Sequence, residues 1–196
     1  MFEPKNTENL SFEEQFKLLM DERNIRNVLD RYSRAASRAD LELYKSCFHD
    51  DAVLRSGPTF QGSISDFYEK FHETADKTCK VGQYYLTNVL MDIDGDVAHT
   101  ETEAFSAKIL HEVDYNGDEV MRLAGFRYLH RFERRNGEWR ISVAWFVSDW
   151  GFFGTIPQQM KNIGVFATAA ERAKNNAFVP KRNSDDISYK FGSMGL

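Results

Sequence analysis

Three dipeptides that end in glycine divide the second half of the chain into long runs rich in β-branched and aromatic residues. They lie at Asp94-Gly95, Asn116-Gly117 and Asn136-Gly137. Asp-Gly and Asn-Gly favour tight hairpin turns, because glycine adopts left-handed backbone angles without a Cβ clash. We therefore predict four long antiparallel strands, which must twist and curl because of their length. The predicted strands cover residues 82–93, 97–113, 120–133 and 138–150.

The first half of the chain has the spacing of helices. Ser11 and Glu14 match a capping box, so a helix should begin near Phe12. Apolar residues recur at helical spacing up to Ala36, and Asp40 and the Ser63 region predict the starts of two further helices. A short strand is predicted between those two helices, at residues 52–54. The pattern predicts an α+β fold in which N-terminal helices cover the concave face of a strongly curved antiparallel sheet and leave a pocket between them.

The composition narrows the class of protein. A net charge of −5 argues against a dedicated nucleic-acid-binding protein. We expect no membrane association and a cytoplasmic location, because no apolar run is long enough to span a bilayer and the N-terminus lacks a signal-peptide pattern. Two cysteines, and five histidines without ligand spacing, predict no metal site. Aromatic residues make up 14% of the chain, enough to line a pocket for a flat apolar ligand as well as to fill a core.

The chain divides into a domain over residues 1–150 and a C-terminal extension over residues 151–196. Repeated glycine and proline break the periodicity of the extension. We predict a helix from about Pro157 to Lys174, followed by an arm that packs on its own domain or on a neighbouring subunit.

Several short motifs occur in an order and at a spacing that are specific when taken together. They are Arg31–Asp40 with Cys47–Ala52, Thr87–Leu90 with Asp94–Asp96, Phe126–Ile141, and Asp149-Trp150. Over residues 12 to 150 the chain resembles the SnoaL-like branch of the NTF2-like superfamily, which includes scytalone dehydratase-like and bile acid dehydratase-like proteins. This resemblance implies a cone-shaped fold and cofactor-independent chemistry on apolar small molecules. It also implies a dimer or trimer.

Enzymes of this family typically use an Asp/His pair inside the cone, and the chain departs from that pattern. Ser37 occupies the usual Asp position and Tyr84 the usual His position. Ser37 retains hydrogen-bonding capacity but is no base. Any acid–base chemistry must therefore come from other side chains.

The candidate catalytic residues are Glu103, Tyr84, His130, Tyr32 and Arg127. The resemblance places Tyr84 and Glu103 in the pocket, where a desolvated carboxylate could accept a proton near neutral pH. The tyrosines would donate hydrogen bonds, His130 would titrate, and Arg127 would hold an oxyanion. Each of these residues also has a purely structural interpretation. Glu103 could be exposed on an outer face, and the tyrosines could be ordinary core residues. His130 could be a half-exposed cross-strand residue, and Arg127 could form a surface ion pair. Candidate substrate contacts are Arg55, Ser37, Tyr85, Asn88, Phe105 and Trp145.

The predicted function is a cofactor-independent lyase. It would be a dehydratase or a retro-aldol-type carbon–carbon lyase in aromatic compound catabolism, acting on a hydroxylated aromatic or polycyclic molecule. Two alternatives stay open: a non-catalytic binding or assembly protein of the same fold, and the small subunit of an aromatic-ring oxygenase. A cone plugged by Tyr84, Tyr85 and Trp145 would favour a non-catalytic role, whereas an open cavity with several polar groups would favour an enzyme. We expect a homo-oligomer, as a trimer or dimer.

Overall fold

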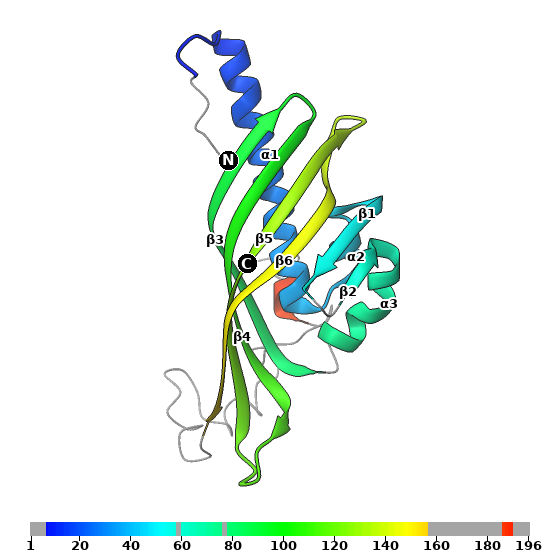
Figure 1. The fold of residues 1–196 in the computed structure, drawn as a ribbon, viewed down its shortest axis with the longest axis vertical. Helices are drawn as coiled ribbons and strands as arrows, with labels where there is room; N and C mark the ends of the chain where they lie inside the picture. Colours follow the sequence, from blue (N-terminus) through cyan, green and yellow to red (C-terminus); the bar gives the residue numbers. More distant parts are fainter. Residues whose placement is uncertain (1–6, 58–59, 76–77, 157–185, 190–196) are drawn as a thin grey trace.

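One long helix and two short ones pack against a single six-stranded sheet (Figure 1). The computed structural model describes residues 7–57, 60–75, 78–156 and 186–189. The helices are α1 (Phe12–Arg38), α2 (Leu41–Lys45) and α3 (Ile64–Ala75), and a short 3₁₀ turn, η3, covers Ile187–Tyr189. The strands are β1 (Phe48–Ser56), β2 (Phe60–Ser63), β3 (Cys79–Asp94), β4 (Val97–Val113), β5 (Glu119–Arg135) and β6 (Glu138–Ile156). Together they confirm the predicted α+β fold, in which N-terminal helices pack on one sheet.

The predicted helix starts are confirmed by their caps. The Ser11 hydroxyl accepts a hydrogen bond from the Glu14 backbone N–H, and the Glu14 carboxylate accepts one from the Ser11 N–H at 2.8 Å. Asp40 caps α2 by accepting from the Leu43 N–H at 2.9 Å. These bonds satisfy backbone donors that have no partner within a helix, which is why the helices begin at these residues.

The sheet has the order β2-β1-β6-β5-β4-β3. Strands β3 to β6 form the predicted antiparallel meander, and Gly95, Gly117 and Gly137 have positive φ angles at its turns. The sheet as a whole is mixed rather than antiparallel, because β1 pairs parallel with β6. Strand β2 was not predicted, since it is only four residues long and has no apolar alternation. Strand β6 also continues past the predicted end at Trp150.

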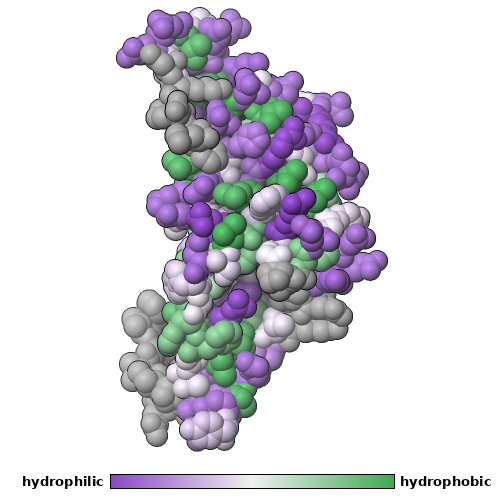
Figure 2. All heavy atoms as spheres, in the orientation of Figure 1, coloured by the Kyte–Doolittle hydropathy of each residue, from purple (hydrophilic) through white to green (hydrophobic). Residues whose placement is uncertain are grey.

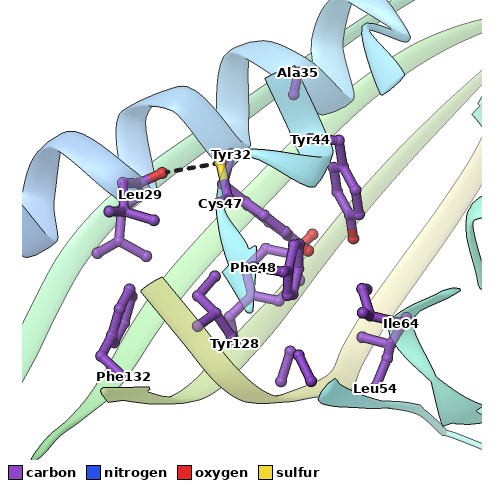
Figure 3. Packing of buried hydrophobic residues seen from close by; sticks show 14 of the residues in the cluster. Leu29, Tyr32, Ala35, Tyr44, Cys47, Phe48, Leu54, Ile64, Tyr128 and Phe132 are labelled. Carbon is purple, nitrogen blue, oxygen red and sulfur yellow. Dashed lines mark hydrogen bonds between the residues drawn. The ribbon is translucent and has the colours of Figure 1, made fainter. Parts of the chain in front are cut away.

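The core lies between α1 and one face of the sheet, which we call the inner face. In Figure 1 the strands lie in front of α1, and α2 and α3 lie beside β1 and β2. Figure 3 shows Tyr32, Tyr44 and Phe48 packed together in this layer, with Tyr128 close to them. The hairpin between β4 and β5 extends beyond the helices (Figure 1), so one end of the inner face lacks helical cover from the described residues.

A buried carboxylate joins α1 to the hairpin between β5 and β6. Asp21 is 6% exposed and accepts hydrogen bonds from Arg134 at 2.7 Å and from the Trp139 indole at 2.8 Å. Arg134 also pairs with the exposed Asp96 in the turn after β3. This arrangement fixes the first half of α1 against the sheet.

Residues 186–189 lie against α1 of the same chain. The Tyr189 hydroxyl donates to the Asp40 carboxylate at 2.6 Å, and the Arg34 guanidinium stacks 4.5 Å from the centre of the Tyr189 ring. The predicted helix over 157–174 lies outside the described residues. Within the part of the chain that the structure describes, no helix is long and apolar enough to cross a membrane.

Candidate functional site

A cavity of about 310 Å³ lies between the three helices and the inner face of the sheet. Four tyrosine side chains line the cavity, one each from α1, α2, β3 and β5. They are Tyr32, Tyr44, Tyr84 and Tyr128. The remaining walls are mainly apolar and include Leu54, Phe67, Phe71, Phe126 and Phe146. This combination of an apolar wall and a few converging polar groups is typical of small-molecule sites.

The inner end of the cavity holds three fully buried phenols. The Tyr32 ring centre lies 5.2 Å from that of Tyr44 and 5.1 Å from that of Tyr128. Burial is the main reason that the pKa of each of the three hydroxyls is raised well above its ordinary value. These groups therefore stay protonated at neutral pH and can donate hydrogen bonds to a ligand.

The fourth tyrosine is held in place by serines of α1. The Ser33 hydroxyl donates to the Tyr84 carbonyl at 2.7 Å, and the Tyr84 N–H donates to the Ser37 hydroxyl at 3.0 Å. Both bonds fix the backbone of β3, so the half-buried Tyr84 side chain points into the cavity beside Phe126. Ser37 thus contacts the Tyr84 backbone and does not line the cavity.

His130 is buried in the core rather than at the cavity wall. It is 2% exposed, stacks on Tyr128 at 5.3 Å between ring centres, and meets Tyr32 edge-on. Neither ring nitrogen has a hydrogen-bond partner among the residues that the structure describes. Desolvation lowers the pKa of this imidazole to about 3, so it stays neutral at physiological pH. An imidazole in this state is a poor candidate for an acid or base near pH 7.

Glu103 does not point into the cavity, so its placement by the family resemblance is wrong. Its side chain lies on the opposite, outer face of the sheet, where the carboxylate accepts a hydrogen bond from the Asn88 amide at 2.7 Å. Glu103 is exposed to solvent, whereas the sequence prediction required a carboxylate buried in the pocket. Asn88 is on the outer face as well, although alternation along β3 placed it beside Tyr84.

Arg127 also lies on the outer face. Its guanidinium donates to both carboxylate oxygens of Asp149, at 2.9 Å and 3.1 Å, and lies 3.9 Å from Glu101. This surface ion pair was the alternative considered for Arg127. It keeps the guanidinium away from any ligand in the cavity.

The remaining predicted substrate contacts gather on the same outer face. Tyr85 lies 6.2 Å from Phe105 between ring centres, and Phe105 lies 6.0 Å from Trp150. The Arg55 guanidinium lies 4.9 Å from the Trp145 ring centre. Figure 2 shows hydrophobic atoms interspersed with hydrophilic ones over the face in view. Because Tyr85 and Trp145 point outward, they do not plug the cone.

Strand alternation explains these placements. On β4 the inward side chains are small or uncharged, from Ala98 to Ser106, whereas Glu101 and Glu103 point outward. On β3 the register with β4 shifts between Leu86 and Val89, and this bulge moves Asn88 to the outer face. Tyr84 lies before the bulge and keeps its inward orientation.

Several polar cavity residues were missed in the sequence, among them Tyr44, Ser106, Lys108 and Arg122. Alternation on β4 carries a signal for two of them, since an outward Glu103 requires inward Ser106 and Lys108. No role in the site was predicted for Tyr44 from the sequence. Its contact with the cavity depends on where α2 packs, which local spacing does not encode.

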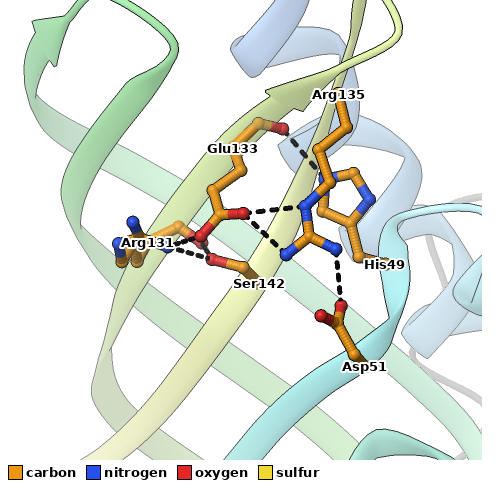
Figure 4. A network of polar contacts seen from close by, with 6 residues as sticks. All are labelled: His49, Asp51, Arg131, Glu133, Arg135 and Ser142. Carbon is orange, nitrogen blue, oxygen red and sulfur yellow. Dashed lines mark hydrogen bonds and ion pairs between the residues drawn. The ribbon is translucent and has the colours of Figure 1, made fainter.

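A separate polar network joins β1 to β5 and β6 (Figure 4). Arg135 donates to Asp51 at 2.7 Å and to Glu133 at 2.7 Å, and the His49 imidazole contacts the Glu133 carbonyl at 2.9 Å. These groups satisfy one another, so we interpret the network as structural. Among the described residues, no group of three potential metal ligands lies close enough to hold an ion.

Comparisons with known proteins agree with the fold and with the family resemblance. Residues 17–144, more than half of the chain, match the SnoaL-like domain family. No curated protein matches the chain.

Three solved structures illustrate the structural similarity. A candidate scytalone dehydratase from Novosphingobium aromaticivorans is 14% identical, with a TM-score of 0.63 over 73% of this chain and 93% of that one. The hexachlorocyclohexane dehydrochlorinase LinA-type3 from Novosphingobium barchaimii is 14% identical, with a TM-score of 0.62 over 74% and 95% of the two chains. An NTF2-like superfamily protein from Salmonella enterica is 18% identical, with a TM-score of 0.58 over 69% and 94%. At these identities the similarity establishes the fold. The chain belongs to the SnoaL-like domain family.

Proposed function

We propose that this chain is a cofactor-independent lyase that binds a small hydroxylated aromatic molecule in its tyrosine-lined cavity. The observation that carries the proposal is the convergence of four phenol groups, from four different elements, on one apolar cavity. Apolar walls favour an aromatic ring, and buried phenols favour a ligand with oxygen atoms that accept hydrogen bonds.

The size of the cavity limits the ligand. A closed apolar cavity of about 150 Å³ can hold benzene. A volume of about 310 Å³ therefore suits a molecule of one or two rings rather than four fused rings. An aromatic alcohol of one or two rings therefore fits this cavity better than a steroid.

Tyr84 is the best placed acid of the described cavity residues. Its phenol would donate a proton to a hydroxyl of the substrate, the C–O bond would break, and water would leave. The resulting phenolate would then accept a proton from the neighbouring carbon, which forms the double bond and restores Tyr84. The three buried phenols would orient the substrate, since their raised pKa values keep them protonated. A retro-aldol cleavage remains the other bond-breaking step to test.

The structural neighbours support a lyase. Two of them are named as a candidate scytalone dehydratase and a dehydrochlorinase, and both names denote lyases. Their low identity means that residue roles are not carried over from them.

A non-catalytic binding protein is the second candidate. The described cavity lining contains no Asp, Glu or His side chain, so the residues that most often act as general bases are missing there. Such a protein would hold the same ligand and leave it unchanged.

Replacing Tyr84 by phenylalanine tests the proposal, because it removes one hydroxyl and keeps the ring. A panel of one- and two-ring aromatic alcohols would be screened for binding by thermal shift, and each hit would be assayed for turnover. We expect turnover to fall about 100-fold or more in Tyr84→Phe, since general acid catalysis contributes roughly 10²–10⁴-fold. Tyr85→Phe is the matched control, because that hydroxyl lies on the outer face and donates to Gln83. Hits that bind tightly but stay chemically intact would support the binding protein instead.

We also propose that the chain forms a homo-oligomer, a trimer or dimer, through the outer face. Trp145, Trp150 and Phe152 are 42%, 51% and 54% exposed there, which favours burial against another surface. Light scattering that gives a monomer mass at micromolar concentration would contradict this. A stoichiometric large partner in pull-downs would instead favour the oxygenase small subunit.

A further inference from the structure

Two basic side chains lie side by side at the exposed end of the cavity. Lys108 on β4 and Arg122 on β5 are direct cross-strand partners, and both line the cavity. Lys108 is partly exposed and Arg122 is exposed, whereas the phenols at the other end are buried. Like charges directly opposite on neighbouring strands destabilise a sheet, so this pairing needs a physical reason.

Neither cation has an acidic partner among the described residues. The Lys108 ammonium lies 5.0 Å from the centre of the Tyr84 ring, and the Arg122 guanidinium lies 5.6 Å from that of Phe153. For each of the two cations, the contact that the structure shows is with an aromatic ring.

Two basic residues near them in the sheet are paired with carboxylates. Lys80 on β3 pairs with Glu119 at 3.1 Å, and Arg127 on β5 pairs with Asp149 at 2.9 Å. Lys108 and Arg122 differ from these two cations in having no acidic partner among the described residues. Two positive charges beside an apolar cavity form a site that a negatively charged group would complete.

We propose that the ligand of this cavity is an aromatic molecule with an anionic oxygen group, such as a carboxylate, bound between Lys108 and Arg122. The guanidinium offers two parallel donors that match a carboxylate or a phosphate, and the ammonium adds a compact charge. The rings of the ligand would occupy the tyrosine-lined part of the cavity. This inference rests on the proposed function and specifies its substrate class.

The test compares ligands that differ only in the anionic group. The probes are naphthalene-2-carboxylate, its methyl ester and 2-naphthyl phosphate, titrated calorimetrically into the full chain. We expect the carboxylate to bind at least tenfold more tightly than the ester, since charge-assisted hydrogen bonds contribute roughly that much. A similar advantage for the phosphate would also support an anion site, and the ratio of the two anions would identify the preferred group. The advantage should shrink as salt concentration rises.

Substitutions locate the anion site. Lys108→Met and Arg122→Met should each remove most of the preference for the anion over the ester. Lys80→Met is the matched control, because it removes the same charge from the same sheet outside the cavity lining. Circular dichroism and thermal melting would show that each variant is folded.

The outcomes separate this inference from the proposed function. Equal binding of acid and ester by the unmodified chain would overturn the anion site and leave the aromatic cavity standing. An equal loss of preference in Lys80→Met would also overturn the anion site. Failure of all three probes to bind would count against both the anion site and the proposed cavity function.

Discussion

Replacing His130 by phenylalanine should make the stability of this protein less dependent on pH. His130 is buried among Tyr32, Tyr128 and Phe132, and its ring nitrogens find no hydrogen-bond partner within the described part of the chain. A phenyl ring keeps the aromatic contacts and removes two polar atoms that are buried at a cost of about 1–3 kcal/mol when unsatisfied. The variant should therefore be at least as stable as the unmodified protein at pH 7.5.

The pH dependence follows from the lowered pKa. In the unfolded chain the imidazole titrates at its ordinary value of 6.5, whereas in the folded chain burial lowers the pKa to about 3. Above pH 6.5 both states are neutral and His130 adds no pH dependence. As the pH falls below 6.5 the unfolded state binds the proton first, so folding stability is lost by about 1.4 kcal/mol per pH unit until about pH 3. Between pH 7.5 and 5.0 this amounts to about 2 kcal/mol.

Urea unfolding at pH 7.5 and 5.0 measures this directly. The unmodified protein should lose about 2 kcal/mol more than His130→Phe between the two pH values. The comparison cancels the contribution of His49, whose pKa is also lowered by burial and which both proteins contain. His99→Gln, which removes an exposed histidine, is the control. Parallel losses in the unmodified protein and His130→Phe would refute the buried, neutral state of His130.

Three further substitutions test contacts that hold the fold together. Gly125→Ala should lower the free energy of unfolding by about 1–3 kcal/mol and change the tryptophan fluorescence, because a Cβ atom there would collide with the Trp150 indole; unchanged stability and fluorescence would contradict this packing. Asp21→Ala should lower the free energy of unfolding in urea by about 3 kcal/mol, because it leaves Arg134 without its buried partner. Asp96→Ala removes the exposed partner of the same arginine and should cost less than about 1 kcal/mol. Equal losses in the two aspartate variants would show that burial does not strengthen the Asp21 contact.

The sequence predicted the fold well because its strongest signals are local. The capping box at Ser11 and the turns at Gly95, Gly117 and Gly137 each fix backbone geometry within a few residues. The parallel pairing of β1 with β6 joins residues about 90 positions apart and has no local signal. It is therefore visible only in the folded chain.

The candidate site was harder to predict, because one residue of register reverses the face on which a side chain lies. Tyr84 and Tyr32 line the cavity as predicted, because Tyr84 precedes the β3 register shift between Leu86 and Val89 and Tyr32 lies on the buried face of α1. Glu103 was assigned inward from the family resemblance, although its strand alternates charged and small residues in a way that favours the outward position. The same alternation predicts that the Lys108 side chain points inward.

The central claim is that ligands bind in the tyrosine-lined cavity and not on the outer face. Ala124 lines the cavity and is 5% exposed, so Ala124→Leu should fill part of the space, whereas Glu103→Gln changes only the outer face. The decisive measurement is calorimetric titration of naphthalene-2-carboxylate into the unmodified protein and both folded variants. We predict that Ala124→Leu weakens binding at least tenfold and that Glu103→Gln binds like the unmodified protein. Normal binding by Ala124→Leu together with loss of binding in Glu103→Gln would contradict the account.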